Sequence, residues 1–432
     1  MFVSDRQPAR ALEHGIDDLR SNGIEFETGG HTERIFDCSL MVISPGVPSD
    51  APIVREAMQR RLPVVSELEV ASWFCKGPIV AVTGSNGKTT TTTLIGRIFS
   101  DAKKKYVVAG NIGEAFSNVV LDVAETDVVV LEVSSFQLDF IQSFRPAVAV
   151  ILNITRNHMD RYGNSMERYA ESKARIFMNQ TSDDILIIND SDEWTRTTAS
   201  RAKSKILRFS ARKQLTDAAF IENGILKTNF SGKYSDIIRT SDISMKGEHN
   251  LQNAMAATLV AQVMDVTPAY IRSTLNNFKG VEHRQELVRE VGGIKYINNS
   301  KATTVEAVEY ALKSYEEPIV LILGGKDKGN DYSTIQDLVK KKVRAIVATG
   351  ASVDIVERAF MGKVPVHRIE TVGDAKPNVV SMEKTVAAAT SLAKKGDVVL
   401  LAPACTSFDW FTDYEERGKV FKMIVNNLKE SE

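Results

Sequence analysis

A glycine-rich loop followed by a lysine and two threonines is the chemically most informative part of this chain. The residues are Gly84, Ser85, Asn86, Gly87, Lys88, Thr89 and Thr90. The apolar run before the loop predicts a buried strand over 78–82, and the apolar spacing after it predicts a helix over 89–99. Backbone N–H groups and the positive end of such a helix attract an anion, the lysine adds a full charge, and a threonine hydroxyl can ligate Mg²⁺. This pattern predicts a nucleotide-phosphate site rather than a plain strand–helix turn.

The loop is a shortened form of the common phosphate-binding pattern. Val82 stands where the longer pattern has a glycine, so that only Gly84 and Gly87 remain. A lysine and threonines in register after a strand keep the chemistry of the longer form.

An acidic residue ends another predicted strand, over 127–133. Glu132 is placed there, and Ser134 and Ser135 follow it. Either serine can cap a helix, which is the alternative interpretation of this cluster. Capping does not explain Glu132, so we favour a metal ligand at this position.

Three further polar positions lie near strand ends or on a helix. His158 lies in the polar segment 153–161, and that density of polar groups favours contact with a phosphate or a metal. Asn111 follows the predicted strand 105–109 and is either part of a turn or a substrate contact. Lys173 lies in a predicted helix over 166–178, where its sequence context alone predicts a solvated side chain.

Two asparagines, Asn250 and Asn253, are three residues apart in a predicted helix and so share one face. They could bracket an adenine or a ribose, or Asn250 could be a helix N-cap. The spacing supports both readings about equally.

Cationic and hydroxyl side chains recur in the last third of the chain, at strand ends or domain starts. They include His283 and Arg284, the segment 299–303, Lys328 and Ser407. Converging groups of this kind suit carboxylates and phosphates. Each one taken singly predicts an ordinary surface residue.

Composition excludes several classes of protein. The chain has 432 residues, a formal net charge of -1 and 43% hydrophobic residues, which predicts two or three domains with substantial cores. There is no basic stripe for nucleic acid and no run long enough to span a membrane. The cysteines are scattered, with no CxxC pair, which favours a reducing compartment. We expect a soluble cytoplasmic protein with no nucleic-acid or membrane partner.

Strand-like and helix-like runs alternate, which predicts an α/β fold with mainly parallel sheets. We expect three blocks, over 1–73, 74–280 and 281–432. The main predicted strands are 2–5, 40–44, 62–66, 78–83, 105–109, 127–133, 147–154, 184–189, 205–209, 224–228, 293–298, 318–323, 343–349, 366–369 and 397–401. The main predicted helices are 51–61, 89–99, 166–178, 250–264, 268–278, 304–313, 352–360, 383–394 and 415–428.

With these motifs in place, the chain resembles the Mur ligase family of ATP-dependent amide-forming enzymes. The matching motifs run in family order across nearly the whole chain: GSNGKTT, GNIG, LEVSSFQL, NHMDR, YAESKARI, GEHNLQNAMAA, EHRQE, NSKAT, LGGKDKG and APACTSFD with YEERG. The motifs LEVSSFQL, SKAT and PAC-x-SFD are most similar to those of the member that adds D-glutamate.

This resemblance implies a fold and a reaction. The fold would be a truncated Rossmann-like N-terminal domain, a P-loop ATPase-like central domain and a Rossmann-like C-terminal domain, in a monomer that uses ATP and Mg²⁺. The enzyme would phosphorylate the carboxylate of UDP-N-acetylmuramoyl-L-alanine, and the amine of D-glutamate would attack the acyl phosphate. The product would be a peptidoglycan precursor.

The resemblance also implies roles for individual residues. Catalytic roles fall on Lys88, His158 and Lys173, and metal ligation on Thr89, Glu132, His158 and Lys173 as a carbamate. ATP contacts fall on 84–90 and on Asn250, Arg284 and Asn299. Contacts to the muramoyl substrate and to D-glutamate fall on Asp5, Arg6, Asn111, Ser134, Lys301, Thr303, Lys328, Ser407 and Tyr414.

The chain departs from the family pattern at a few points. We expect it to begin about one βα unit late, without the usual first strand and glycine-rich loop, which puts affinity for the uridine nucleotide in question. Asn299 stands where the family usually has aspartate, and Tyr414 where it often has phenylalanine. Two alternatives therefore remain: another Mur or folylpolyglutamate-type ligase, or a truncated form that binds ATP without turnover.

Overall fold

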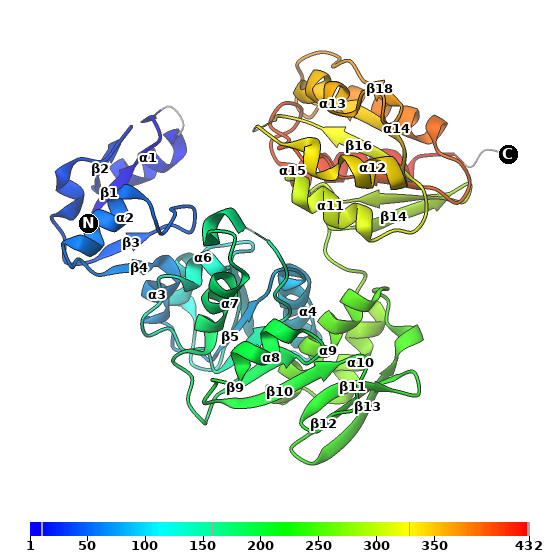
Figure 1. Cartoon of the computed structure of the whole chain (residues 1–432). Helices are drawn as coiled ribbons and strands as arrows, with labels where there is room; N and C mark the ends of the chain where they lie inside the picture. Colours follow the sequence, from blue (N-terminus) through cyan, green and yellow to red (C-terminus); the bar gives the residue numbers. More distant parts are fainter. Residues whose placement is uncertain (10–11, 158, 328, 430–432) are drawn as a thin grey trace. The chain divides into compact units, whose positions relative to one another are not determined.

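The structure is a computed structural model that describes residues 1–9, 12–157, 159–327 and 329–429. The chain divides into two compact units, Met1–Phe278 and Lys279–Glu432, and each is described by itself. Figure 1 labels the helices and strands used below.

The first unit begins with two small parallel pairs of strands. β1 (Phe2–Asp5) pairs with β2 (Glu25–Thr28), and β3 (Met41–Ile43) pairs with β4 (Val64–Ser66). Three α-helices accompany these strands: α1 (Glu13–Ser21), α2 (Pro52–Gln59) and α3 (Glu67–Ser72). A small core forms around β3, β4 and α2, and it includes Phe140 from later in the chain.

A nine-stranded sheet forms the main body of the first unit. Its spatial order is β13-β12-β11-β10-β9-β8-β5-β7-β6. The strands are β5 (Ile79–Thr83), β6 (Tyr106–Gly110), β7 (Val128–Glu132), β8 (Val148–Ile151), β9 (Ile185–Asn189), β10 (Lys205–Ser210), β11 (Ala218–Glu222), β12 (Ile225–Phe230) and β13 (Lys233–Arg239). Strands β5 to β11 pair in parallel, whereas β11, β12 and β13 form an antiparallel extension.

Helices cover both faces of this sheet, and each face has its own apolar core. One face carries α4 (Lys88–Asp101), α9 (Glu248–Val263) and α10 (Pro268–Asn277). The other face carries α5 (Phe116–Val119), α6 (Ser135–Leu138), α7 (Met166–Ala174) and α8 (Glu193–Ala199), together with α3. Because the central strands are buried on both sides, they consist of nearly continuous apolar residues.

The second unit is a six-stranded sheet in the order β14-β15-β19-β16-β17-β18. The strands are β14 (Glu286–Val291), β15 (Ile294–Asn298), β16 (Ile319–Gly324), β17 (Val343–Thr349), β18 (Val366–Arg368) and β19 (Val398–Leu401). Only β14 runs antiparallel to its neighbour in this sheet, as part of a hairpin with β15. The helices α11 (Val305–Lys313), α12 (Gln336–Lys342) and α13 (Val353–Phe360) pack on one face, and α14 (Val379–Leu392) and α15 (Tyr414–Asn426) on the other.

The predicted α/β class with mainly parallel sheets is confirmed. The main strands and helices occur where predicted, with ends that differ by a few residues. The prediction missed β2, β11, β13 and β14. Strands β2, β13 and β14 carry charged residues, so that they lack a clear buried-strand signal. Strand β11 is apolar but short, and periodicity alone does not assign such a run.

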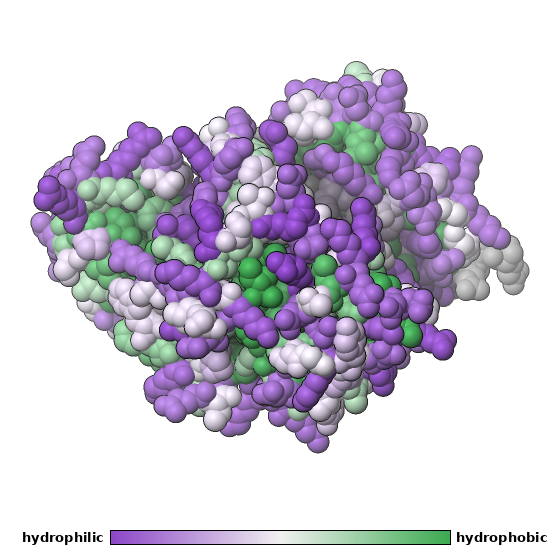
Figure 2. Space-filling model, turned by 60° about the horizontal axis from the view of Figure 1, so that its bottom comes forward, coloured by the Kyte–Doolittle hydropathy of each residue, from purple (hydrophilic) through white to green (hydrophobic). Residues whose placement is uncertain are grey.

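Two general properties of the described residues bear on function. No helix in this part of the chain has the length and apolar character needed to cross a bilayer. The surface in Figure 2 is largely hydrophilic, and hydrophobic side chains form small separate patches on it.

Candidate active site

The phosphate loop joins the end of β5 to the start of α4. Gly87 is the helix N-cap and has a left-handed φ of 84°. A Cβ added at Gly87 would lie 2.4 Å from Asn253 Oδ1, so this position is restricted by packing as well as by backbone conformation. The loop therefore lies directly against α9, the helix that carries both asparagines singled out in the sequence.

The loop is held in shape by the segment that follows β8. Ser85 N donates to Asn153 O over 2.9 Å, and Asn86 N donates to Asn153 Oδ1 over 2.9 Å. The Ser85 hydroxyl donates to Thr155 O over 2.9 Å. Strands β5 and β8 are neighbours, so their carboxyl ends bring these segments together. Ser85 and Asn86, predicted as ATP contacts, thus also fix the loop conformation.

Two lysines converge on one carbonyl of this loop. Lys88 Nζ donates to Gly84 O over 2.9 Å, and Lys173 Nζ donates to the same oxygen over 3.0 Å. Lys173 is only 1% exposed, and its Nζ lies 4.6 Å from the centre of the Tyr169 ring. The prediction that Lys173 is solvated, made from its sequence context, was wrong, because the face of α7 that carries Lys173 packs against the phosphate loop.

Burial and charge both act on the Lys173 amine. Burial holds the pKa of Lys173 well below its ordinary value, and the neighbouring Lys88 cation lowers it further. Asp139 opposes this shift but is itself buried, which raises the pKa of its carboxyl. Lys173 is therefore far more readily neutral than an exposed lysine, and a neutral amine can act as a nucleophile.

Glu132 is a buried carboxylate beside the loop. Its position in β7 is in register with Val82 of β5, immediately before the phosphate loop. Asn111 Nδ2 donates to Glu132 Oε1 over 2.9 Å, whereas Glu132 Oε2 is buried and has no hydrogen-bond partner among the described residues. A buried carboxylate oxygen without a partner fits a site that receives a cation. Asn111, predicted to contact substrate, orients this carboxylate.

Thr89, the other predicted magnesium ligand of the loop, is buried in the first turn of α4. The described residues contain no group of three or more His, Cys, Asp and Glu side chains that could hold a metal by themselves. A hydroxyl, one carboxylate and the oxygens of a bound phosphate suit Mg²⁺, which is often held by few protein ligands. The residues present therefore fit a nucleotide-bound Mg²⁺ better than a metal site made of protein alone.

Ser134 has a structural partner at the start of α6. It forms a capping box with Gln137, in which the Ser134 hydroxyl accepts from Gln137 N. The alternative interpretation, that a serine caps a helix, is therefore correct for Ser134. Capping does not explain the position of Glu132. His158 lies outside the described residues, and so does Lys328.

Asn250 and Asn253 do share a helix face, as their spacing predicted. Asn253 Nδ2 lies 3.4 Å from Asn250 Oδ1, and Asn250 Nδ2 donates to Lys246 O over 2.8 Å. The N-cap of α9 is Gly247, so the alternative of Asn250 as N-cap was wrong. Because Asn253 lies against Gly87, the two asparagines lie next to the phosphate loop.

A second group of predicted residues lies in the second unit, after β15 and β19. Asn299 is buried, and its Oδ1 accepts from Gln285 N over 3.2 Å, next to Arg284. Lys301 Nζ lies 5.4 Å from the centre of the Tyr414 ring. Ser407 is 2% exposed, so the general expectation of a surface residue was wrong there.

The neighbours of these residues keep the group together. Lys301 N donates to His283 O, and Thr303 N donates to Lys301 O. Strands β15 and β19 pair in parallel, so the 299–303 and 402–407 segments leave the sheet side by side. The structure thus brings Lys301, Thr303, Ser407 and Tyr414 to the region beyond the carboxyl ends of β15 and β19.

Asp5 and Arg6 are predicted to lie near a uracil pocket. Asp5 is the last residue of β1, and Arg6 follows it. Asp5 Oδ1 accepts from Gln7 N over 2.7 Å, and Arg6 is exposed. The Asp5 carbonyl also accepts from Gly30 N over 3.4 Å.

Sequence reasoning missed some residues that shape both groups. Asn153 anchors the phosphate loop, and Tyr169 covers Lys173 from one helical turn away. The spacing of Tyr169 and Lys173 by four residues was a usable signal, because such residues share a helix face. Arg417 lies inside the quoted motif YEERG, yet nothing in its sequence context indicated that it is buried.

The fold and the loop together define an α/β protein with a P-loop for nucleotide phosphates. Sequence models of three domains match the chain: "MurD N-terminal domain" over 1–53, "Mur ligase middle domain" over 82–261 and "Mur ligase, glutamate ligase domain" over 283–405. The chain belongs to the Mur ligase family.

Relatives in that family match along nearly their whole length. The UDP-N-acetylmuramoylalanine--D-glutamate ligase of Salinibacter ruber is 45% identical over 99% of this chain and 93% of its own. The enzyme of the same name from Clostridioides difficile is 39% identical, with the same coverage of both chains.

Solved structures share the fold at low identity. UDP-N-acetylmuramate-alanine ligase MurC from Thermotoga maritima aligns with a TM-score of 0.56 and 18% identity, covering 99% of each chain. E. coli FolC in complex with DHPP and ADP aligns with a TM-score of 0.59 and 16% identity, covering 89% of this chain and 99% of its own.

Proposed function

We propose that this chain is the ATP-dependent ligase that joins D-glutamate to UDP-N-acetylmuramoyl-L-alanine in the synthesis of peptidoglycan precursors. The observation that carries the proposal is the 45% identity, over 99% of this chain, to a relative named for that reaction. The P-loop, with Lys88 and Lys173 on one carbonyl, supports it independently as a phosphate-handling centre.

The reaction needs activation of a carboxylate, which is a poor electrophile. A carboxylate oxygen of the L-alanyl group attacks the γ-phosphorus of ATP, the bond to the bridging oxygen breaks, and ADP leaves. The neutral amine of D-glutamate then attacks the acyl carbon, loses a proton, and phosphate leaves. Both steps bring anions together, so they depend on positioning and charge neutralisation more than on proton transfer.

The phosphate loop supplies most of that neutralisation. The N–H groups at the start of α4 point toward an anion bound in front of the helix. Lys88 Nζ, which donates to Gly84 O and Ser85 O, is a flexible cation within reach of the same space. We propose that it transfers its hydrogen bonds to the β- and γ-phosphates when ATP binds.

Glu132 and Thr89 are proposed to hold Mg²⁺ with the phosphates, and His158 to hold a second ion. Bound Mg²⁺ would neutralise charge on the phosphates and on the attacking carboxylate. Asn111 donates to Glu132 Oε1, and Oε2, which has no partner among the described residues, would be the oxygen available to hold the cation. Lys173 is proposed to carry a carbamate, because the lone pair of a buried neutral amine can add to the carbon of carbon dioxide, and loss of one N–H proton to solvent then leaves an anionic carbamate.

The second unit is proposed to bind D-glutamate through Lys301, Thr303, Lys328, Ser407 and Tyr414. Asn250, Arg284 and Asn299 are proposed to contact the nucleotide, and Asp5, Arg6, Asn111 and Ser134 the muramoyl substrate. We place the domain limits at residues 73 and 280, and we propose a monomeric enzyme.

A substrate panel tests the proposal. The purified chain is incubated with ATP, Mg²⁺, UDP-N-acetylmuramoyl-L-alanine and one amino acid at a time, and phosphate release and product mass are measured. The expected result is turnover with D-glutamate and with none of the other amino acids. Turnover with L-alanine, a diamino acid or a dipeptide would identify another ligase of the family, and ATP binding without phosphate release would favour an inactive nucleotide-binding form.

Lys88→Ala is expected to lower ADP formation by at least roughly 100-fold, because the variant lacks the cation that faces the transferred phosphoryl group. ADP release is measured at saturating substrates. The control is Lys105→Ala, which removes an exposed lysine beyond the far end of α4 and should leave the rate unchanged. Equal rates for the two variants would refute the role of Lys88.

A further inference from the structure

Arg417 is a buried cation in the first turn of α15. It is 3% exposed, and within the described part of the chain it forms no ion pair with a carboxylate. Burial lowers the pKa of the Arg417 guanidinium to about 10, so it remains charged at neutral pH. Burying such a charge is costly unless hydrogen bonds compensate it, which indicates that its partners matter.

The partners of Arg417 belong to two loops that are far apart in sequence. Its Nε donates to Ser300 Oγ over 2.9 Å and its Nη2 to Ser300 O over 2.7 Å. Its Nη1 donates to Cys405 O over 3.1 Å. A planar guanidinium fixes the directions of these three bonds, so it sets the spacing between the loops.

Each of these loops carries proposed D-glutamate contacts. Ser300 precedes Lys301 and Thr303, and Cys405 lies two residues before Ser407. The hydroxyl of Ser300 also donates to the carbonyl of Tyr414 over 2.7 Å, which adds the start of α15 to the same network. One side chain therefore connects all the described segments to which the amino-acid site is assigned.

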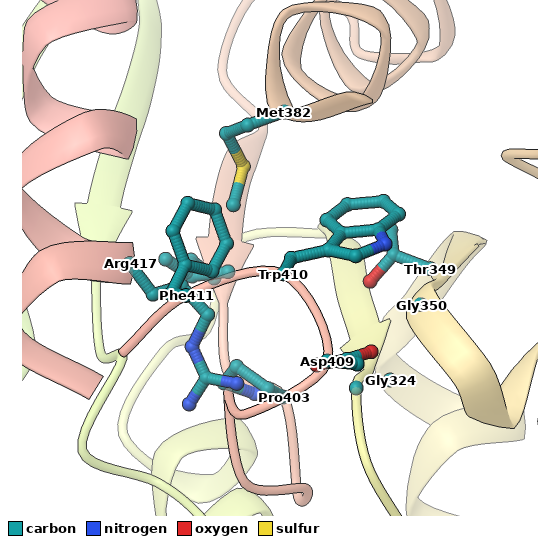
Figure 3. Close-up of a pocket in the computed structure, with 11 residues that line it drawn as sticks. Gly324, Thr349, Gly350, Met382, Pro403, Asp409, Trp410, Phe411 and Arg417 are labelled. Atoms are coloured by element: carbon teal, nitrogen blue, oxygen red, sulfur yellow. The ribbon is translucent and has the colours of Figure 1, made fainter. Parts of the chain in front are cut away.

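Packing around Arg417 leaves little room for the loops to adjust. Figure 3 shows the side chain extending from α15 past Phe411 toward Pro403, beside a small pocket that Gly324 and Gly350 also line. A Cβ on Gly325 would lie 2.4 Å from Thr406 O and 3.3 Å from Arg417 Nη1.

The backbone next to this contact is strained. Ala404, just before Cys405, has a left-handed φ of 57°, which residues with a Cβ rarely adopt. Its N–H donates to Ala302 O, directly between the two loops. Strained conformations persist where the surroundings over-determine them, and the bonds of Arg417 are part of those surroundings.

We propose that Arg417 is a positioning residue for the D-glutamate half of the site. It does not bind the ligand itself, because its guanidinium is buried and directed at Ser300 and Cys405. It holds the 299–303 and 404–407 segments at the spacing that lets Lys301, Thr303 and Ser407 face one amino acid. This inference rests on the proposed function.

The test uses Arg417→Lys in the full chain. Lysine keeps the charge and loses the planar arrangement of donors, so the loops should separate slightly. We expect the KM for D-glutamate to rise roughly 10- to 100-fold, as misplacement of binding groups by about 1 Å would give. The KM for ATP should rise less than the KM for D-glutamate, because the phosphate loop lies in the other unit and only Asn299, among the proposed nucleotide contacts, lies in a segment that Arg417 holds.

Arg344→Lys is the matched control. Arg344 forms a two-point ion pair with Asp397, over 2.5 and 3.0 Å, at the opposite end of the strands of the same sheet. Loss of this two-point ion pair in Arg344→Lys should lower the thermal stability without raising the KM for D-glutamate. A rise in that KM as large as that of Arg417→Lys would refute a specific positioning role.

Amide hydrogen exchange without substrates gives a readout that does not depend on the reaction. Arg417→Lys should speed exchange in 299–303 and 404–407. If the variant exchanges these amides at the same rate as wild type, the proposal is overturned. If wild type fails to use D-glutamate, the proposed function is wrong, and exchange still decides whether Arg417 orders the loops.

Ser300→Ala keeps the test valid if Arg417→Lys does not fold. This variant removes one acceptor for Arg417 and the bond to Tyr414 O. Faster exchange in both loops, with a smaller rise in the KM for D-glutamate, would support the proposal. Unchanged exchange would refute it.

Discussion

A lysine that is taken out of water must either find partners for its charge or lose its proton. Among the described residues, Lys173 Nζ donates to Gly84 O and lies over the face of Tyr169, while the Lys88 cation is close enough to repel it. Burial first, and the Lys88 cation second, outweigh the contacts with Gly84 O and Tyr169 and lower the pKa of Lys173, which favours the neutral amine. At the scale of the residue, the protonation state of a lysine is therefore set by its surroundings as well as by its own chemistry.

Lys173→Met should stabilise the protein and remove ligase activity. In the unfolded chain the amine has its ordinary pKa of 10.5, whereas the folded-state pKa is well below it. Below pH 10.5 the unfolded state binds the proton more readily, so the free energy of unfolding of wild type falls as pH falls. The melting-temperature gain of the variant should thus be larger at about pH 6 than at about pH 9.

The measurement is thermal unfolding in buffer depleted of carbon dioxide. Lys105→Met, at an exposed lysine, serves as control and should show no pH-dependent gain. A gain for Lys173→Met that is the same at both pH values would contradict a lowered pKa. Activity of Lys173→Ala, tested with short-chain acids that mimic a carbamate, addresses the proposed modification separately.

At the scale of the element, the loop between β5 and α4 is shaped by what packs around it. Gly87 combines a left-handed φ with a close approach of Asn253, whereas Gly113 has a left-handed φ of 62° and open space around it. Substitution of Gly113 would therefore add backbone strain alone, whereas substitution of Gly87 would add both backbone strain and a steric clash.

Gly87→Ala should abolish ATP binding, and Gly113→Ala should leave it nearly intact. Both variants carry left-handed strain of about 1–2 kcal/mol, but only Gly87→Ala drives a Cβ against Asn253 and displaces the loop. Calorimetric titration with a non-hydrolysable ATP analogue measures the difference. Equal affinities for the two variants would show that the loop tolerates the added carbon.

Helix α3 is fastened to the segment after α6 by a single carboxylate. Glu69 is fully buried and accepts from the N–H groups of Gln142, Ser143 and Phe144 and from Trp73 Nε1. Burial acts to raise the pKa of Glu69, but the hydrogen bonds, that of the Ser143 hydroxyl first among them, outweigh it and lower the pKa below 4.5.

Glu69→Gln should cost about 1–3 kcal/mol of stability at neutral pH, because backbone donors lose an ionised partner. The folded-state pKa is below the unfolded value of 4.5, so this stability is present above that value and is lost as pH falls through the folded pKa. The gap between variant and wild type in urea unfolding should therefore shrink in acid. Glu67→Gln, at a carboxylate that accepts from Ser117 N, should cost less.

At the scale of the whole molecule, the proposed phosphate site and the proposed amino-acid site belong to different compact units. The loop at 84–90 lies in Met1–Phe278, and Lys301, Thr303 and Ser407 lie in Lys279–Glu432. Each unit has its own apolar cores, so a small change in one unit should not alter the other.

Thr303→Ala and Ser407→Ala should therefore each raise the KM for D-glutamate about tenfold, the loss expected for one hydrogen bond to a charged ligand group. The affinity for ATP should stay within about twofold of wild type. Steady-state kinetics with each substrate varied in turn measures both values. A weaker ATP affinity with an unchanged KM for D-glutamate would reverse the assignment of these residues.

The sequence predicted the strongly patterned parts of the fold well. Strands β5, β7, β8 and β16 are apolar runs buried on both faces, so composition alone marks them. The edge strands β13 and β14 carry exposed charged residues and take their shape from their neighbours. The same is true of Lys173 and Ser407, whose burial depends on elements distant in sequence.

Local pattern by itself determined the phosphate loop, the strand before it, the alternation of strands and helices, and the family, because these depend on residue order and short-range spacing. Only the tertiary structure decided that Lys173 is a buried amine on the loop carbonyl and that Glu132 keeps one oxygen without a partner. It also decided that Arg417 joins two loops. Burial, pKa and hydrogen bonding depend on which segments are in contact in the folded protein, and local sequence patterns do not specify those contacts.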